Sequence, residues 1–198
     1  MTRHSETGYV LRGGMPESYQ KVVVNPFLRR IGPPNSDKQV LDAHAGRGGV
    51  GFYIAEQGYP VALLDYNQIA FDQATKARAE LQKVGLINKN IAEYAREKPG
   101  SVYALHAKDP WNGNVGIYTD NIIGAISIFQ DLLEPDGHLL ISSIHLWGYL
   151  MTYLLMKQMG FNKINVSSWT PEMSEVENDW YRGGEAVKRY VLSCRKKV

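Results

Sequence analysis

Residues 42–51 combine a carboxylate, an imidazole and four glycines in one short segment, Asp-Ala-His-Ala-Gly-Arg-Gly-Gly-Val-Gly. Glycine lets the backbone approach a ligand closely, and a helix that starts in such a segment presents free N–H groups. A second carboxylate, Asp65, follows the next apolar run. These residue types in this order predict a ligand site that is built from backbone amides and carboxylates.

The literal string Gly46-x-Gly48-x-x-Gly51 matches the dinucleotide-binding fingerprint. Asp65 comes nineteen residues after Gly46, close to the separation of about 20 that is expected for a ribose-binding carboxylate. The string alone does not separate a nicotinamide enzyme from other adenosine-cofactor enzymes, so an NAD-dependent oxidoreductase stays open as an alternative. A packing turn without a ligand would leave two strand-end acids without partners.

Asp42 stands four residues before Gly46, at a point where a dehydrogenase strand usually stays apolar. This arrangement resembles the first motif of the class I S-adenosylmethionine-dependent methyltransferases, an acid followed by a glycine-rich turn. Two later segments resemble elements of the same family, namely residues 132–141 (LLEPDGHLLI) and residues 159–161 (MGF). The resemblance covers about residues 39–196 and implies S-adenosyl-L-methionine as the cofactor.

The resemblance also implies roles for individual side chains. Asp42 would serve the methionine ammonium group, and Asp65 would accept hydrogen bonds from the two ribose hydroxyls. Asn90 falls where the family often has an acid near the adenine, with Asn88 as the nearby competitor. The cofactor-binding residues expected on this basis are Asp42, His44, Gly46, Gly48, Asp65 and Asn90.

A partial resemblance to the amino-methyltransferases of nucleic acids concerns the methyl acceptor. Those enzymes carry a bulky residue at the position of His44 and an Asp-Pro-Pro-aromatic motif after the fourth strand, which Asp109-Pro110-Trp111 resembles with one proline fewer. It implies that Asp109 and the Pro110 carbonyl accept hydrogen bonds from an exocyclic amino group, while Trp111 stacks on an extruded base. The alternative is a surface turn that begins with Asp-Pro.

The elements that must position these residues alternate between strand and helix. Regular alternation predicts an α/β fold of Rossmann-like type. It has a seven-stranded, mostly parallel sheet, helices on both faces and a C-terminal antiparallel strand pair. Expected strands are 40–42, 61–64, 86–87, 101–107, 139–141, 164–169 and 188–194. Expected helices are 16–31 (whole or broken at Asn25-Pro26), 50–57, 69–84, 91–98, 121–133 and 146–159. Ligands of such sheets bind at the carboxyl ends of the strands.

Composition narrows the class of protein. The chain has 198 residues, a formal net charge of +2 and one cysteine, Cys194, which excludes an internal disulfide. The five histidines lack metal-ligand spacing, so we expect no metal. Residues 1–14 have no apolar core of the signal-peptide kind, and the most apolar stretch, 139–159, is interrupted by polar residues. We therefore expect a cytoplasmic protein without a membrane segment.

Together these observations predict a helical extension at residues 1–36 and a methyltransferase domain at 37–198. Basic residues gather near both ends of the chain, which would suit an RNA or DNA substrate or form ordinary solvated surface. The expected reaction is N-methylation of a nucleic-acid base. A small-molecule or protein acceptor, and a cofactor-binding module without catalysis, stay open. The sequence does not indicate the oligomeric state.

Overall fold

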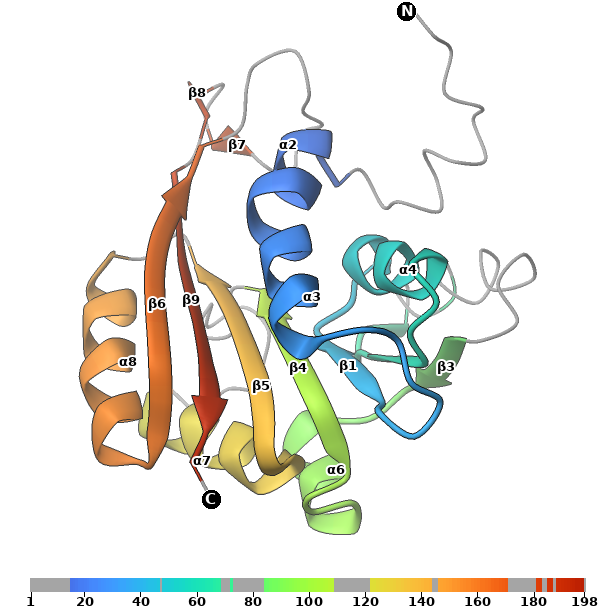
Figure 1. Cartoon of the computed structure of the whole chain (residues 1–198). Helices are drawn as coiled ribbons and strands as arrows, with labels where there is room; N and C mark the ends of the chain where they lie inside the picture. The colour runs from blue at the N-terminus through green and yellow to red at the C-terminus, as the bar shows by residue number, and fades with distance from the viewer. Residues whose placement is uncertain are drawn as a thin grey trace, which may run out of the picture.

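The computed structural model describes residues 15–46, 48–68, 72, 84–108, 122–143, 146–170, 181–182, 185–186 and 188–197. Strands and helices alternate along most of these residues, as the spacing of apolar runs predicts (Figure 1). Asp109, Pro110 and Trp111 lie outside the described residues, so their assigned roles stay predictions from the sequence.

Seven strands form one sheet in the order β3-β2-β1-β4-β5-β9-β6. Their bounds are β1 Val40–Ala43, β2 Val61–Leu64, β3 Val84–Ile87, β4 Val102–Lys108, β5 Leu133–Ser143, β6 Phe161–Trp169 and β9 Arg189–Lys196. The strands from β3 to β5 pair in parallel, whereas β9 pairs antiparallel with β5 and with β6. The predicted mostly parallel sheet with an antiparallel C-terminal pair is confirmed.

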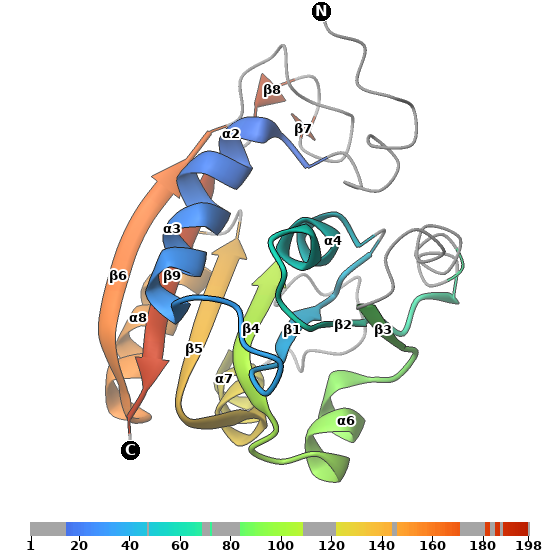
Figure 2. The same cartoon turned by 45° about the vertical axis from the view of Figure 1, so that its right-hand side comes forward.

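The N-terminal helical segment and α4 (Gly49–Glu56) cover one face of the sheet (Figure 2). This segment consists of α2 (Glu17–Tyr19), the π-helical turn η1 (Gln20–Val24) and α3 (Asn25–Ile31). Pro26 does not end it; the proline lies in the first turn of α3, directly after the π-helical turn, and such single π turns accommodate irregularities within a helix. Tyr19 and Phe27 are buried in one hydrophobic cluster with strand residues such as Val40 and Val191. The boundary predicted after residue 36 falls in the connector between α3 and β1.

Helices α6 (Ile91–Glu97), α7 (Ile122–Leu132) and α8 (Leu146–Gln158) cover the opposite face. Phe129 and Leu132 of α7 pack there with Leu139 of β5 and Met156 of α8. Helices on both faces are therefore confirmed. No helix within the described residues is long and apolar enough to cross a bilayer.

Three local predictions need correction. The helix expected to reach Val84 does not, because Val84–Ile87 pairs with β2 as a full strand, and strand pairing overrides helical spacing. Strand β5 begins at Leu133 and includes the expected turn, where Asp136 has a left-handed φ of 63°. A short hairpin of β7 (Tyr181–Arg182) and β8 (Glu185–Ala186) was not expected.

Candidate functional site

The candidate residues converge at the carboxyl edge of the parallel strands. Asp42 is the third residue of β1, Asp65 directly follows β2, and Asn88 directly follows β3. Strands β1 and β4 are neighbours in the sheet, with β2 and β3 on one side and β5 on the other. The chain therefore reverses its direction of winding between β1 and β4, which is where sheets of this kind bind ligands.

The loop after β1 is held by backbone hydrogen bonds in a conformation that few side chains tolerate. The amides of His44 and Ala45 donate to the Leu64 carbonyl at 2.8 and 3.2 Å, and the Gly48 amide donates to the Ala45 carbonyl at 2.7 Å. His44, Gly46 and Gly48 have φ values of 62°, 53° and 83°. Such left-handed backbone favours glycine, so His44 is an unusual residue at the first of these positions.

Gly46 and Gly48, the two glycines with left-handed backbone in this loop, have different surroundings. A Cβ on Gly48 would lie 2.5 Å from the Phe52 ring and 2.8 Å from Leu63, so tight packing under α4 requires glycine. A Cβ on Gly46 would meet no described atom within 4 Å. Apart from its chain neighbours, no described atom therefore contacts this position, and a side chain there would project away from the described packing.

The Asp65 carboxylate is fixed by the loop that it faces. Its Oδ2 accepts a hydrogen bond from the Gly46 amide and its Oδ1 accepts one from the Asn67 amide, each at 2.8 Å. The side chain is buried, with 7% exposed. Each carboxylate oxygen keeps further acceptor capacity, so a pair of hydroxyls beside Gly46 can bind to it.

The Asp42 carboxylate takes part in a buried polar network that the sequence analysis did not find. Its Oδ2 accepts from the Gly51 amide at 2.8 Å, and its Oδ1 lies 2.7 Å from His106 Nδ1. His106 Nε2 lies 3.4 Å from the Tyr19 hydroxyl, which donates to Ser142 Oγ at 2.9 Å. The four side chains of the network, those of Asp42, His106, Tyr19 and Ser142, are each at most 2% exposed. The network joins β1, β4 and β5 to the N-terminal helix.

His106 could have been noticed in the sequence, because a histidine interrupts an otherwise apolar strand at residues 102–107. The spacing of the histidines along the chain gives no sign of this role, because His106 acts singly and its partner lies in another strand. The sequence alone could not identify Asp42 as the partner of His106, because the two residues meet only through the register of β1 with β4, in which they are directly paired. Within the described residues, no group of three or more His, Cys, Asp or Glu side chains is placed to hold a metal ion.

His44 links the glycine loop to the end of β4. Burial lowers the pKa of His44 to about 3, a hydrogen bond with the Lys108 backbone opposes this shift, and the nearby His106 adds to it. The imidazole is therefore neutral at physiological pH. Lys108 is the last residue of β4 and directly precedes Asp109. The structure thus brings His44 to the start of the predicted acceptor motif.

Asn90 and Asn88 occupy different environments. Asn90 caps α6, because its Oδ1 accepts a hydrogen bond from the Ala92 amide at 2.8 Å. Asn88 donates through Nδ2 to Gln68 Oε1 at 2.7 Å, and both side chains are exposed near the end of β2. Capping gives Asn90 a structural role of its own. Its cofactor role stays a prediction, and Asn88 is the better exposed candidate.

Comparison with solved structures gives three informative similarities. A geranyl diphosphate C-methyltransferase from Streptomyces coelicolor, crystallised with S-adenosyl-L-homocysteine, aligns with a TM-score of 0.66 and 14% identity over 100% of this chain and 86% of that one. A precorrin-6y C5,15-methyltransferase from Geobacter metallireducens gives 0.65 and 13%, with 87% of each chain covered. An O-methyltransferase from Thermotoga maritima gives 0.60 and 15%, and the match covers 83% of this chain but only 61% of that one.

No protein-family model matches the sequence, and a search of curated proteins gives no match. At 13–15% identity, the structural similarities show the fold. The chain therefore has the fold of the class I S-adenosylmethionine-dependent methyltransferases. The further resemblance to nucleic-acid amino-methyltransferases gains no support from these structures and stays a prediction from the sequence.

Proposed function

We propose that this chain is an S-adenosyl-L-methionine-dependent methyltransferase. One observation carries the proposal, namely that two carboxylates at the ends of adjacent strands are fixed by the glycine-rich segment. Asp65 accepts a hydrogen bond from the Gly46 amide, and Asp42 accepts one from the Gly51 amide. A Cβ on Gly46 would meet no described atom within 4 Å. The residues present fit the cofactor, because it needs a hydroxyl-binding carboxylate, a negative charge near its cationic part and close backbone approach.

The chain's own residues would divide these tasks. Asp65 binds the ribose hydroxyls, and Asp42 supplies a fixed negative charge beneath the loop. His44, neutral and next to the end of β4, presents an imidazole that adds no positive charge near a cationic ligand. When bound, the cofactor supplies an activated methyl group. The remaining contribution of the protein to catalysis would be to place the acceptor atom in line with this methyl group.

The acceptor that we propose from the sequence is an amino nitrogen of a nucleic-acid base. Asp109 and the Pro110 carbonyl would bind its two hydrogens, which localises the nitrogen lone pair, and Trp111 would stack on the ring. This proposal is supported by the position of the motif in the sequence, directly after Lys108, the last residue of β4, whose backbone His44 contacts. No metal is required for it.

A small-molecule acceptor is the second candidate. The similar solved structures include methyltransferases of geranyl diphosphate and of precorrin-6y. Transfer of a labelled methyl group from the cofactor into separate pools of total RNA, DNA and metabolites distinguishes the candidates. Label in RNA or DNA supports the first candidate, and label confined to metabolites supports the second.

Cofactor binding is tested separately by calorimetry with S-adenosylhomocysteine and with NADH. We expect saturable binding of the former, loss of binding in Asp65→Ala, and no binding of NADH. Asp109→Ala should bind S-adenosylhomocysteine normally and lose methyl transfer. Saturable NADH binding without S-adenosylhomocysteine binding would instead support the oxidoreductase alternative. Cofactor binding without transfer to any pool would indicate a binding module.

A further inference from the structure

A separate hollow of about 380 Å³ lies on the α3 face of the sheet, away from the predicted cofactor site. Its polar and aromatic lining includes Arg30, Tyr103, His138, Lys163, Ser193 and Arg195. His138 of β5 pairs with Ala104 near the start of β4, whereas the cofactor edge begins after Lys108. Four residues of strand span about 13 Å, so the two sites are distinct.

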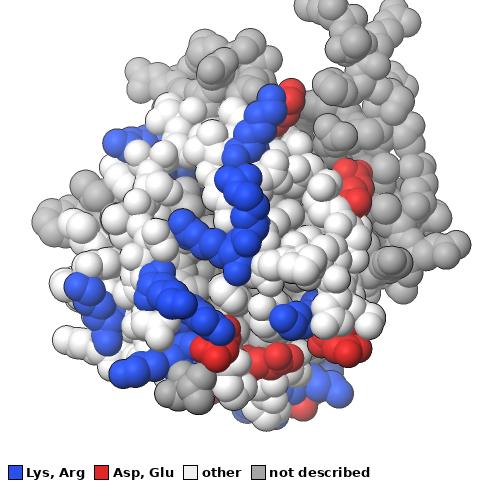
Figure 3. Space-filling view, viewed as in Figure 1, with Lys and Arg blue, Asp and Glu red and all other residues white. Residues whose placement is uncertain are grey.

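Three cationic side chains reach this hollow from three different elements. Arg30 lies in the last turn of α3, Lys163 lies in β6, and Arg195 lies in β9. Arg195 and Ser193 share one face of β9, because alternate residues of a strand point the same way. Arg30 Nη1 donates to Ser193 Oγ, which places the guanidinium over β9. Figure 3 shows Lys and Arg side chains gathered on this face of the molecule.

Lys163 is placed by an irregularity in the sheet. Asn162 pairs with Arg195 and Asn165 pairs with Ser193, so Lys163 and Ile164 together face the single residue Cys194. This is a β-bulge, and Lys163 within it has a left-handed φ of 49°. Bulges re-aim side chains, and a strained non-glycine residue is often found where it serves a function.

Positive charge dominates the hollow. The pKa of His138 is lowered to about 4, first by burial and then by Arg195, Lys38 and Lys163, with Asp136 acting in the opposite direction. Asp136 forms an ion pair with Arg195 at 3.1 Å. The ion pairs of the described residues do not include Arg30, Lys38 or Lys163. One acid therefore faces several cations.

We propose that this hollow is a binding site for a phosphate group, held by Arg30, Lys163 and Arg195 together with the Ser193 hydroxyl. Guanidinium groups match the geometry of a tetrahedral oxyanion, and an ammonium group adds a further charged donor. A partly enclosed position strengthens such contacts relative to open surface. The proposal is independent of the proposed methyltransferase function.

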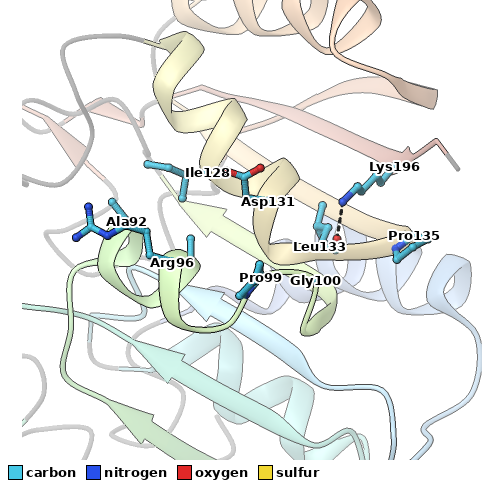
Figure 4. A pocket seen from close by; sticks show the side chains of 10 residues that line it. Ala92, Arg96, Pro99, Gly100, Ile128, Asp131, Leu133, Pro135 and Lys196 are labelled. Carbon is cyan, nitrogen blue, oxygen red and sulfur yellow. Dashed lines mark hydrogen bonds between the residues drawn. The ribbon is translucent and has the colours of Figure 1, made fainter.

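A second hollow, between α6 and α7, lacks this cationic lining (Figure 4). Its Lys196 ammonium donates to the carbonyls of Leu133 and Gln130, each at 2.7 Å. Arg96 and Asp131 also line it. Its lining thus has two cations and one acid, and one of the cations, Lys196, already donates to backbone carbonyls. The hollow at α3 has three cations in its lining and no acid among its lining residues.

The test is calorimetric titration of the full chain with inorganic pyrophosphate at low ionic strength, where charge interactions are least screened. We expect saturable binding that is at least about tenfold weaker in Lys163→Asn, since one charged hydrogen bond is lost. Asparagine tolerates left-handed backbone, so this variant should fold. Lys157→Asn on α8 is the matched control, with the same charge change away from the hollow, and should bind as the wild type does.

A fluorescent single-stranded oligoribonucleotide forms the second arm, because the phosphate could belong to a free compound or to a nucleic-acid backbone. Oligonucleotide binding that is weakened by Lys163→Asn and displaced by pyrophosphate assigns the site to a nucleic acid. Pyrophosphate binding alone assigns it to a free phosphate compound. If neither affinity differs between Lys163→Asn and Lys157→Asn, the proposal is overturned. S-adenosylhomocysteine binding should be unchanged in both variants.

Discussion

The buried pair of Asp42 and His106 gives a quantitative prediction. Replacing His106 with leucine removes the partner at 2.7 Å from a carboxylate that is 2% exposed, and leaves it with the Gly51 amide. Leaving a buried polar group without one of its hydrogen-bond partners costs about 1–3 kcal/mol, and more for a charged group. Because Asp42 keeps the Gly51 amide as a partner, we expect a loss of about 3 kcal/mol in the free energy of unfolding. For a chain of this length that corresponds to a melting temperature lowered by about 6–12 °C.

The assay is urea unfolding followed by circular dichroism, with a double-mutant cycle. Asp42→Asn combined with His106→Leu should cost less than the two single changes added together, with a coupling energy of about 2 kcal/mol. Lys157→Asn, an exposed change on α8 outside the network, is the control and should change stability by less than about 0.5 kcal/mol. A His106→Leu variant with the wild-type unfolding midpoint, or a cycle without coupling, would refute the account of this network.

Three further predictions concern the loop and the protonation of histidine. Gly46→Ala should cost about 1–2 kcal/mol of stability from its left-handed backbone alone, yet abolish detectable S-adenosylhomocysteine binding in calorimetry. Gly48→Ala should unfold more readily than Gly46→Ala in urea, because its methyl group would also overlap the Phe52 ring. The unfolding free energy should fall as pH decreases from about 6.5 to 4, because the unfolded state protonates His44 and His138 while the folded state keeps both neutral. His138→Gln should reduce this slope, and an unchanged slope would contradict the low pKa of His138.

The sequence predicted most of the fold because its signals are local. Apolar runs that end in Asp42 and Asp65, with glycines between them, indicate strand, turn and helix without knowledge of distant residues. The order of those elements then determined a mostly parallel sheet, since short connecting helices allow few topologies. The error at Val84 arose because helical spacing continued into a strand that only pairing with β2 stabilises.

The tertiary structure decided which residues meet. His106 is 64 residues from Asp42, and only the parallel register of β1 with β4 places them in contact. Ser193 lies 163 residues from Arg30, and Lys163, in a bulge of β6, lines the same hollow. Contacts of this kind depend on strand register and on the packing of a helix across the sheet. No periodicity within a single segment encodes them. The glycine-rich loop between a strand and a helix was therefore predictable from the sequence, while the buried network beneath it and the cationic hollow were not.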